Sequence, residues 1–351
     1  MKWEDNVRKV IPYVAGEQPD ISDMVKLNTN ENPYPPAPGV TDLAKEMDVE
    51  KLRLYPDTNA EPLVDVLSEY YGVAKNRIFV GVGSDDVLAM AFLTFFNSDK
   101  PILFPDVTYS FYDVWANLYR IPYKTVPLKD DWSIDADDYK VPNGGVIFPN
   151  PNAPTGLFEP LEKVEEIIKA NPDVVVIVDE AYVDFGGESA LSFTDKYENL
   201  LVVRTFSKSR SMAGLRIGFC IGSEKLIKYL NDAKYSVNSY TMNLPSQILG
   251  AEAVKDDRYF KETLSKIINT RERFKKELTR LGFTFPDSKS NFIFASHKTV
   301  DADHIYNELR KKNIFVRHWN KDRIANYLRI TIGTDEEMDK VVKALEEILG
   351  C

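Results

Sequence analysis

Short runs of consecutive apolar residues, each followed by a turn and then by a stretch of helical spacing, constrain this chain most. The clearest runs are residues 145–148, 174–178, 200–204 and 217–221. A strand without polar alternation has both faces buried, as in a parallel sheet that is covered by helices on both sides. The repeated strand–helix alternation from residue 41 onward therefore predicts an α/β fold with a mostly parallel central sheet flanked by helices.

The flanking elements are weaker signals. Strands are also expected at 77–80, 101–104 and 123–128, and helices at 41–47, 62–71 and 110–119. Residues 7–14 could hold a short helix, which Pro12 limits. A further helix should follow the turn at 81–83, with Ser84 as its N-cap and Asp85 and Asp86 in its first turn.

The pattern changes after about residue 245. A long charged helix is expected over 256–281, followed by short strands, a helix over 301–312, and a last helix that begins with a capping box of Thr334 and Glu337. We therefore expect an N-terminal arm (1–40), a large α/β domain (41–255) and a small α+β domain (256–351) that includes part of the arm.

Composition excludes several classes of protein. The 351 residues carry 44 Lys and Arg against 54 Asp and Glu, a net charge of −10, which disfavours general nucleic-acid binding. Two cysteines, Cys220 and Cys351, and three histidines give neither a disulfide framework nor a zinc cluster, and they suit a reducing cytoplasm. The opening residues lack a secretory pattern, and the apolar runs are too short to span a membrane.

An acid and a lysine follow two of the apolar runs. Asp179 comes directly after residues 174–178, and Lys208 follows 200–204 after a short turn. Ligands in α/β folds bind at the carboxyl ends of parallel strands. Alone, Asp179 is better explained as a helix cap or as one partner of an ion pair, and Lys208 as an ordinary surface lysine. A desolvated strand-end lysine, however, has a lowered pKa and attacks carbonyl groups.

A site for an anion is expected beside them. The turn at 81–83 precedes a helix N-terminus, where Ser84, Asp85 and their backbone N–H groups favour a phosphate. Ser207 and the fork of Arg216 add donors that match phosphate geometry. The turn is neither a dinucleotide fingerprint nor a P-loop. A ligand with a phosphate, a carbonyl and a ring nitrogen facing Asp179 fits all three parts, and that ligand is pyridoxal phosphate.

Sequence motifs in the same order over nearly the whole chain resemble those of the fold-type I, class II pyridoxal-phosphate-dependent aminotransferases, and most closely the histidinol-phosphate branch. The motifs are Asn-Glu-Asn-Pro at 30–33, Asn-Pro-Asn-Ala-Pro-Thr-Gly at 150–156, Asp-Glu-Ala-Tyr at 179–182, Ser-Lys at 207–208 and Leu-Arg-Ile-Thr at 328–331. The resemblance implies amino transfer between L-histidinol phosphate and 2-oxoglutarate, in two half-reactions, by a cytoplasmic homodimer of histidine biosynthesis.

The resemblance also implies roles for single residues. Tyr109 would stack on the cofactor ring, although packing in an aromatic core explains it too, and Tyr182 would donate a hydrogen bond to the ring hydroxyl. Tyr55 would reach the cofactor phosphate in the neighbouring subunit. The substrate would be held by four residues: Tyr13, Asn30, Arg317 and Arg329.

One position departs from the family pattern. Ala153 stands where the family usually has an asparagine before Pro-Thr-Gly, so we expect Asn152 to reach the ring in its place. Three rival functions are a threonine-phosphate decarboxylase, an aromatic amino acid aminotransferase, and a non-enzymatic cofactor-binding regulator. The regulator would need a DNA-binding domain, for which no length remains. His318, beside Arg317, is a weaker candidate for a substrate contact.

Overall fold

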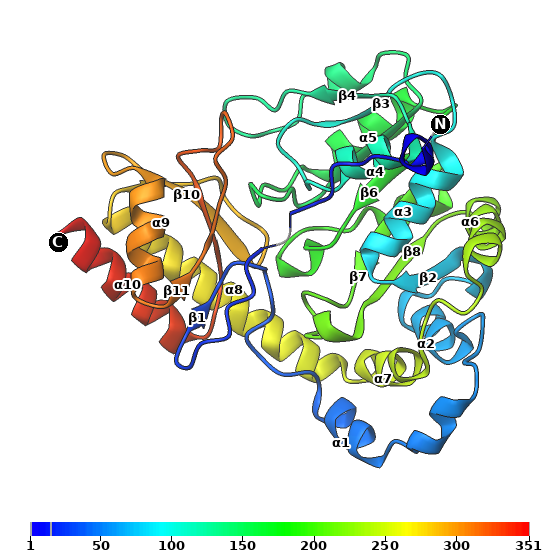
Figure 1. The fold of residues 1–351 in the computed structure, drawn as a ribbon, viewed down its shortest axis with the longest axis horizontal. Coiled ribbons are helices and arrows are strands. Elements are labelled where there is room, and N and C mark those ends of the chain that lie inside the picture. Colours follow the sequence, from blue (N-terminus) through cyan, green and yellow to red (C-terminus); the bar gives the residue numbers. More distant parts are fainter. Residues whose placement is uncertain (1, 15, 351) are drawn as a thin grey trace.

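The central sheet of the protein is mostly parallel, as the apolar runs predict. The computed structural model describes residues 2–14 and 16–350, and within them seven strands form a sheet with the order β2-β8-β7-β6-β5-β3-β4 (Figure 1). These strands are β2 (Ile78–Val82), β3 (Ile102–Pro105), β4 (Tyr123–Val126), β5 (Gly145–Pro149), β6 (Val176–Asp179), β7 (Leu200–Thr205) and β8 (Ile217–Ile221).

Helices cover both faces of this sheet. Leu201 and Val203 of β7 pack toward one helical layer, and Leu200 and Val202 pack toward the other, so every residue of this run is buried. The first layer is formed by α3 (Ser84–Phe95), α4 (Tyr112–Tyr119) and α6 (Glu224–Val237). The second is formed by α5 (Leu161–Ala170), α1 (Pro38–Glu46), α2 (Glu61–Tyr71) and α7 (Leu244–Lys255).

Strand β8 runs against the expected direction. Its apolar run predicted another parallel strand, but β8 pairs antiparallel with both β7 and β2, so this prediction was wrong. The connection from β7, residues 206–216, consists of turns and a short 3-10 helix at Ala213–Leu215. A parallel return typically needs a crossover α-helix. The short connection matters for the site because it carries both Lys208 and Arg216.

The C-terminal lobe, which we define as α8 to α10 with β9 to β13, has its own core and its own antiparallel sheet of order β12-β13-β10-β9. Helix α8 runs from the neighbourhood of α7 into this lobe (Figure 1). The capping box predicted for the last helix is confirmed. The elements are α8 (Asp257–Arg280), β9 (Phe283–Thr284), β10 (Phe292–His297), α9 (Ala302–Lys311), β11 (Ile314–Phe315), β12 (Arg317–His318), β13 (Leu328–Thr331) and α10 (Asp335–Leu349).

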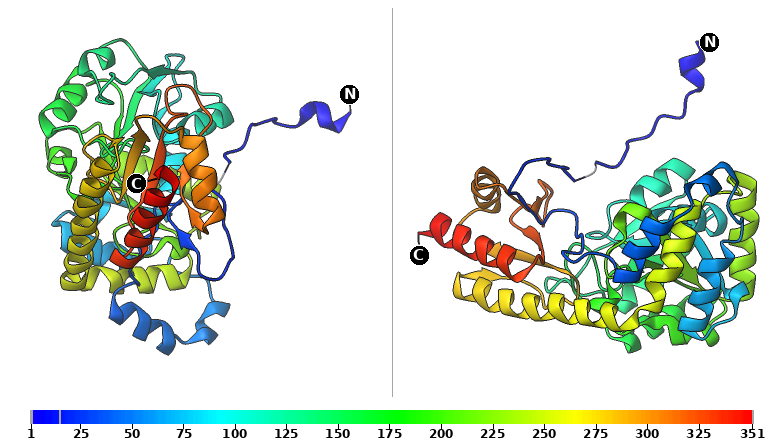
Figure 2. Two further views of the ribbon diagram at one scale, coloured as in Figure 1. Left: turned by 90° about the vertical axis from the view of Figure 1, so that its left-hand side faces the viewer. Right: turned by 90° about the horizontal axis from the view of Figure 1, so that it is seen from below.

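The N-terminal segment is tied to the C-terminal lobe. Strand β1 (Val25–Lys26) pairs parallel with β11, and Val25 lies opposite Ile314. The short helix considered for residues 7–14 is absent, and only a 3-10 turn at Trp3–Asn6 precedes them. A short helix without a packed face is not stable. The first residues extend away from the rest of the molecule (Figure 2).

Further 3-10 helices lie at Val49–Arg53, Lys75–Arg77, Ala136–Tyr139, Val183–Phe185 and Ala190–Asp195. Within the described residues no helix is long and apolar enough to cross a membrane, and no group of histidine, cysteine and acidic residues could hold a metal ion. Cys220 is buried with a free thiol, and Cys351 lies outside the described residues.

Candidate active site

Two adjoining cavities, each of about 200 Å³, open at the carboxyl ends of β5, β6 and β7. The inner cavity is lined by Asp179, Lys208 and Arg216, so the structure brings together the three residues that the strand-end argument selected. Ser84, Asp85 and Ser207 line it as well. The outer cavity extends from it toward the C-terminal lobe. The residues that line both cavities are Thr29, Tyr109, Ala153, Tyr182 and Lys208.

Lys208 lies at the junction of the two cavities. Its Nζ donates a hydrogen bond of 3.0 Å to the backbone carbonyl of Thr29. Burial and the positive charges of Arg329 and Arg216 lower the pKa of Lys208 to about 8. A substantial fraction of this amine is therefore neutral near pH 7 to 8, which is the form that attacks a carbonyl carbon.

Asp179 ends β6 with its carboxylate buried in the inner cavity. The Tyr112 hydroxyl donates to Oδ2 at 2.9 Å, and the Ala181 N–H donates to Oδ1 at 3.1 Å. Burial raises the pKa of Asp179 to about 6, although both hydrogen bonds oppose that rise. Tyr112 was not among the site residues that the sequence predicted.

Arg216 is held by the start of helix α3. Its Nη2 lies 2.9 Å from Asp85 Oδ2, and its Nη1 donates to Ser207 Oγ at 3.4 Å. The Tyr109 hydroxyl donates to the other carboxylate oxygen of Asp85 at 2.7 Å. Asp85 therefore orients both the guanidinium and the aromatic ring.

The N-terminus of α3 differs from the expectation. Gly83, not Ser84, is the N-cap, and the Asp86 carboxylate accepts a 2.9 Å hydrogen bond from the Val82 N–H. Gly83 has a φ of +83°, and a Cβ there would lie 2.5 Å from Arg216 Nη2. Ser84 is thus the first helical residue, and its N–H is among those that a helix leaves without an internal partner.

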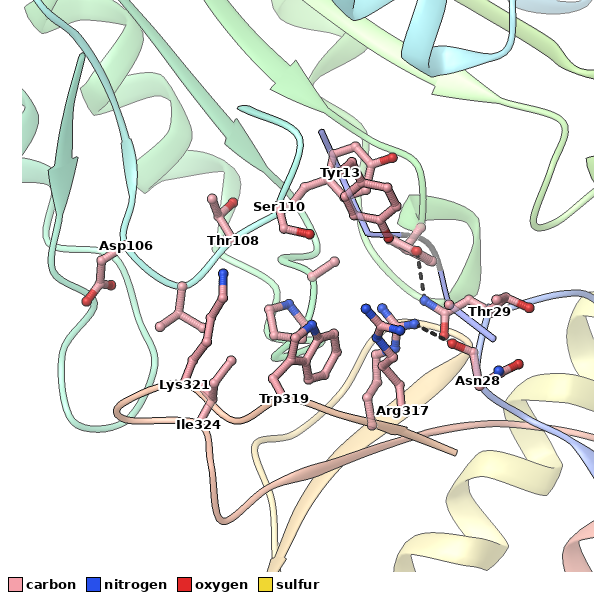
Figure 3. A pocket seen from close by; sticks show the side chains of 18 of the residues that line it. Tyr13, Asn28, Thr29, Asp106, Thr108, Ser110, Arg317, Trp319, Lys321 and Ile324 are labelled. Carbon is pink, nitrogen blue, oxygen red and sulfur yellow. Dashed lines mark hydrogen bonds between the residues drawn. The ribbon is translucent and has the colours of Figure 1, made fainter. Parts of the chain in front are cut away.

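The outer cavity is lined by segments from three distant parts of the chain. Tyr13 comes from the N-terminal segment and stacks on Phe111, with ring centroids 4.2 Å apart. Arg317 and Trp319 rise from the C-terminal lobe toward Tyr13 and Ser110 (Figure 3). The lining residues that the sequence analysis missed include Trp319, Lys321 and Asp322.

Arg329 lies at the floor of the outer cavity. Its Nη2 donates to the Asn28 carbonyl at 2.9 Å, while its buried Nε has no hydrogen-bond partner among the described residues. Burial lowers the pKa of this guanidinium below its ordinary value. An unpartnered buried donor of this kind is costly without an anion beside it.

Tyr182 and Asn30 are joined by a hydrogen bond of 2.8 Å from the Asn30 amide to the Tyr182 hydroxyl. The Asn30 side-chain carbonyl accepts from the Thr331 hydroxyl at 3.0 Å, so β13 fixes the amide. Asn30 has a φ of +58°, a left-handed conformation that asparagine tolerates. Burial raises the pKa of Tyr182, which keeps its hydroxyl protonated.

Asn152 does not line either cavity. Its amide donates to the Val107 carbonyl and to the Thr155 hydroxyl, both at 3.0 Å, within the loop after β5. Ala153 lines both cavities instead. The expectation that Asn152 reaches the cofactor ring is therefore corrected, since its side chain is used to brace the loop.

Two other residues lie away from the cavities of their own chain. Tyr55 is 81% exposed and packs against Tyr240, with ring centroids 4.4 Å apart. The His318 ring faces the Ala325 carbonyl at 2.7 Å and packs near Tyr306, so it does not line the substrate cavity.

Comparison with known proteins places this site in a family. Residues 22–345 match the family model "Aminotransferase class I and II", and the chain belongs to this family. It is 50% identical over 349 residues to the histidinol-phosphate aminotransferase of Lactococcus lactis subsp. cremoris, covering 99% of this chain and 98% of that protein. It is 52% identical over 346 residues to that of Brachyspira hyodysenteriae, covering 98% of both chains.

Solved structures share the fold. The histidinol-phosphate aminotransferase from Sinorhizobium meliloti, in complex with pyridoxal-5′-phosphate, superimposes with a TM-score of 0.85 at 24% identity, covering 93% of this chain and 91% of that one. The enzyme of the same name from Clostridium acetobutylicum gives a TM-score of 0.86 at 23% identity, covering 93% and 99%. At these identities the likeness shows the fold.

Proposed function

We propose that the chain is a pyridoxal-phosphate-dependent aminotransferase that interconverts L-histidinol phosphate and 2-oxoglutarate with imidazole-acetol phosphate and L-glutamate. The observation that supports it most is the identity of about half of all residues, over nearly the full length, with histidinol-phosphate aminotransferases. The residues that line the two cavities are chemically suited to that reaction.

The inner cavity fits pyridoxal phosphate by the chemistry of its donors. Arg216, Ser207, Ser84 and the N-terminus of α3 offer donors for a phosphate at one end. At the other end both polar contacts of Asp179 are with neutral donors, so its carboxylate can still meet a cationic ring nitrogen. A Cβ at Gly218 would lie 2.2 Å from the backbone of residues 83 and 84, so glycine is required for β8 to approach the phosphate end.

When bound, the cofactor supplies a ring that accepts electrons from the substrate carbon. The chain's own residues supply the acid–base chemistry. Asp179 would stabilise positive charge on the ring nitrogen, and the Tyr182 hydroxyl, held by Asn30, would donate to the ring oxygen. The Lys208 amine would hold the cofactor covalently at its aldehyde carbon, with loss of water, and as a free amine it would be the group that moves a proton between the substrate and cofactor carbons. Tyr109 lines the same cavity and supplies an aromatic face.

The outer cavity supports a doubly negative substrate group. Arg329 has a free buried donor, and Arg317 lies near it with its Nη2 3.4 Å from the Val14 carbonyl. Phosphate and carboxylate groups both accept paired hydrogen bonds from guanidinium. The same arginines can therefore hold histidinol phosphate in one half-reaction and 2-oxoglutarate in the other, with Tyr13 and Asn30 lining the space between.

A homodimer with shared sites is part of the proposal. Tyr55 is highly exposed and lies among exposed apolar side chains that a second copy would cover. These are Val49, Leu52, Leu54, Val237 and Tyr240. A tyrosine at such an interface can donate to the phosphate of the neighbouring site. We also propose the division into the arm (1–40), the large domain (41–255) and the small domain (256–351), and a cytoplasmic location.

A half-reaction assay tests the proposed function. The purified protein loaded with pyridoxal phosphate should be yellow, and histidinol phosphate should discharge the visible absorbance of the lysine-bound cofactor, without release of carbon dioxide. Phenylalanine and O-phosphothreonine are the comparison donors. Faster discharge by phenylalanine would favour an aromatic aminotransferase, and carbon dioxide release from O-phosphothreonine would favour a decarboxylase.

Mixing two inactive variants tests the shared site. Tyr55→Ala lacks the residue offered to the neighbour, and Lys208→Ala lacks the amine. After equal amounts exchange subunits, about one quarter of the sites should regain both groups by random pairing. Recovery of that fraction supports the dimer with shared sites, whereas no recovery in a mixture shown to contain mixed dimers contradicts it.

A further inference from the structure

A largely buried polar network lies next to the turn that carries Lys208. The proposed reaction assigns no role to this network. Asp184, in the 3-10 helix after β6, accepts a hydrogen bond of 2.6 Å from Ser209 Oγ through its Oδ2. Its Oδ1 pairs with Nη2 of Arg204. Arg204 and Ser209 are only 7% and 3% exposed, whereas the Asp184 side chain that joins them is 25% exposed. Ser209 directly follows Lys208 in the chain.

The charge on this network strengthens the bond to Ser209. Burial acts to lower the pKa of Arg204, but the carboxylates of Asp184 and Glu180 raise it above its ordinary value, so the guanidinium stays charged. The distance of 2.6 Å from Ser209 Oγ to Asp184 Oδ2 is at the short end for a hydrogen bond between two oxygens, and a guanidinium beside the acceptor strengthens such a bond. The Ser209 hydroxyl is therefore held firmly.

The same turn is held by a second segment. The Asn32 amide donates to the Lys208 carbonyl at 3.0 Å and to the Ser209 carbonyl at 3.2 Å. The backbone of residues 208–209 is thus fixed by one side chain from the N-terminal segment and by another from the turn after β6.

We propose that Asp184 is a positioning residue, which acts through Ser209 to aim the Lys208 amine at the junction of the two cavities. This inference rests on the proposed function, because it takes Lys208 as the residue that bonds the cofactor. An error of about 1 Å in the place of a reacting group can cost up to roughly 100-fold in rate. Releasing the turn should therefore slow the chemistry without weakening substrate binding.

The chain offers a matched control. Ser189 Oγ also donates to a buried carboxylate, that of Glu180, at 2.6 Å. Ser189 lies in the same segment between β6 and β7 as Asp184, but it is distant from Lys208 in the sequence. Ser209→Ala and Ser189→Ala therefore each remove one serine–carboxylate hydrogen bond, and only Ser209 adjoins Lys208 in the chain.

Two measurements on the full chain separate positioning from stability. In the cofactor-free protein, the rate at which an amine-reactive reagent labels Lys208, followed by mass spectrometry against pH, reports the pKa of the amine. In the loaded protein, kcat and KM are measured for each half-reaction. The charged and titratable groups that face the amine are unchanged in both variants: Glu31, Asp85, Tyr182, Arg216 and Arg329.

We expect Ser209→Ala to lower kcat by about 10- to 100-fold with KM within about twofold. The labelling midpoint should rise by about one pH unit, because a loosened amine reaches water more easily. Ser209→Thr should restore most of the rate, Asp184→Asn should follow Ser209→Ala, and Ser189→Ala should match the wild type in both measurements. If Asp184→Asn folds poorly, Ser209→Ala decides the matter.

The proposal is overturned if Ser209→Ala and Ser189→Ala have the same kcat and the same labelling midpoint. It is equally overturned if the loss in Ser209→Ala lies in KM alone. A separate experiment tests the proposed function itself. The wild-type chain is reduced with borohydride in the presence of pyridoxal phosphate, and the absence of cofactor on the peptide that contains Lys208 would overturn the proposed function.

Discussion

The inner and outer cavities adjoin at Lys208, yet they are built in different ways. The inner cavity is formed by the carboxyl ends of neighbouring strands and by the start of α3, and its charged groups are already engaged, as Arg216 is by Asp85. The outer cavity is assembled from residues more than 300 positions apart, such as Tyr13 and Arg317. Within the part of the chain that the structure describes, the buried Nε of Arg329 has no hydrogen-bond partner.

This difference separates chemistry from selectivity. Backbone hydrogen bonds along the sheet fix the inner cavity, so the spacing of its reactive groups depends little on loops. Packing between the arm and the C-terminal lobe fixes the outer cavity, and loops on a rigid scaffold are where binding preferences change. Substitutions in the inner cavity should therefore alter the rate with every substrate, whereas those in the outer cavity should alter the choice among substrates.

The largest effect is expected at the junction. Lys208→Ala should remove the covalent attachment of the cofactor and lower kcat by at least about 1000-fold with every donor, because both the attachment and the proton transfer are lost. Visible absorbance and single-turnover rates measure this. The surface variant Lys225→Ala is the control and should match the wild type. An undiminished visible band in Lys208→Ala would assign the attachment to another residue.

The outer cavity should respond through substrate binding. Arg329→Lys should lower kcat/KM by roughly 100-fold for histidinol phosphate and for 2-oxoglutarate, because lysine cannot reproduce paired hydrogen bonds from a fixed fork. Arg317→Lys should cost about tenfold, since this side chain is partly exposed. The visible spectrum should stay unchanged in both variants. A changed spectrum with unchanged kcat/KM would mean that Arg329 belongs functionally to the inner cavity.

The inner cavity should also make the cofactor-free protein sensitive to pH. Asp179 has its pKa raised by burial from 3.8 to about 6, so the folded chain holds a proton that the unfolded chain has lost across that range. The free energy of unfolding should therefore fall as pH rises from about 4 to 6, by roughly 2 kcal/mol from this group. Urea unfolding at a series of pH values measures the slope.

Two variants show how much of the pH dependence of the free energy of unfolding comes from each buried carboxyl group. Asp179→Asn should remove the decrease between pH 4 and 6. Glu180→Gln should remove a second part that extends higher, because burial raises the pKa of Glu180 from 4.5 to about 7. A slope in Asp179→Asn equal to that of the wild type would show that the carboxyl is already ionised in the folded state.

The smallest effect is expected at Ala153, which lines both cavities. Ala153→Asn adds an amide beside the cofactor ring, so it should shift the pH midpoint of the visible absorbance by less than about one unit and change kcat by less than about fivefold. Asn152→Ala should leave the spectrum unchanged and lower stability by about 1 to 3 kcal/mol, because it releases a buried loop brace. If Asn152→Ala shifted the visible spectrum and Ala153→Asn did not, Asn152 would be the partner of the cofactor ring after all.

Much of the inner cavity could be predicted from local patterns. The apolar runs indicated which strands are buried on both faces, and strand ends in such sheets gather at one edge, which is enough to bring Asp179 near Lys208. The direction of β8 could not be predicted in this way, because it depends on the connection through residues 206–216 and not on the composition of the strand.

The missed contacts share a physical reason. Tyr112 donates to Asp179, but its aromatic neighbours made it look like a core residue, and a hydroxyl direction has no signature in the sequence. Asn152 lies in an irregular loop, where no periodicity predicts which way a side chain points. The Thr29 contact uses a backbone carbonyl, and every residue has one. The outer cavity was predicted mainly from family resemblance, since its segments are distant in the chain.

The pairing of β1 with β11 couples the N-terminal segment to the C-terminal lobe. The Leu27 N–H donates to the Phe315 carbonyl, and the Leu27 carbonyl accepts from the Thr331 N–H. The Asn28 carbonyl accepts from Arg329, and the Thr29 carbonyl accepts from Lys208. Any rocking of the C-terminal lobe would be passed to the lysine through three consecutive peptide units. Residues 27–29 thus connect the C-terminal lobe and Arg329 to the Lys208 amine through consecutive backbone carbonyls.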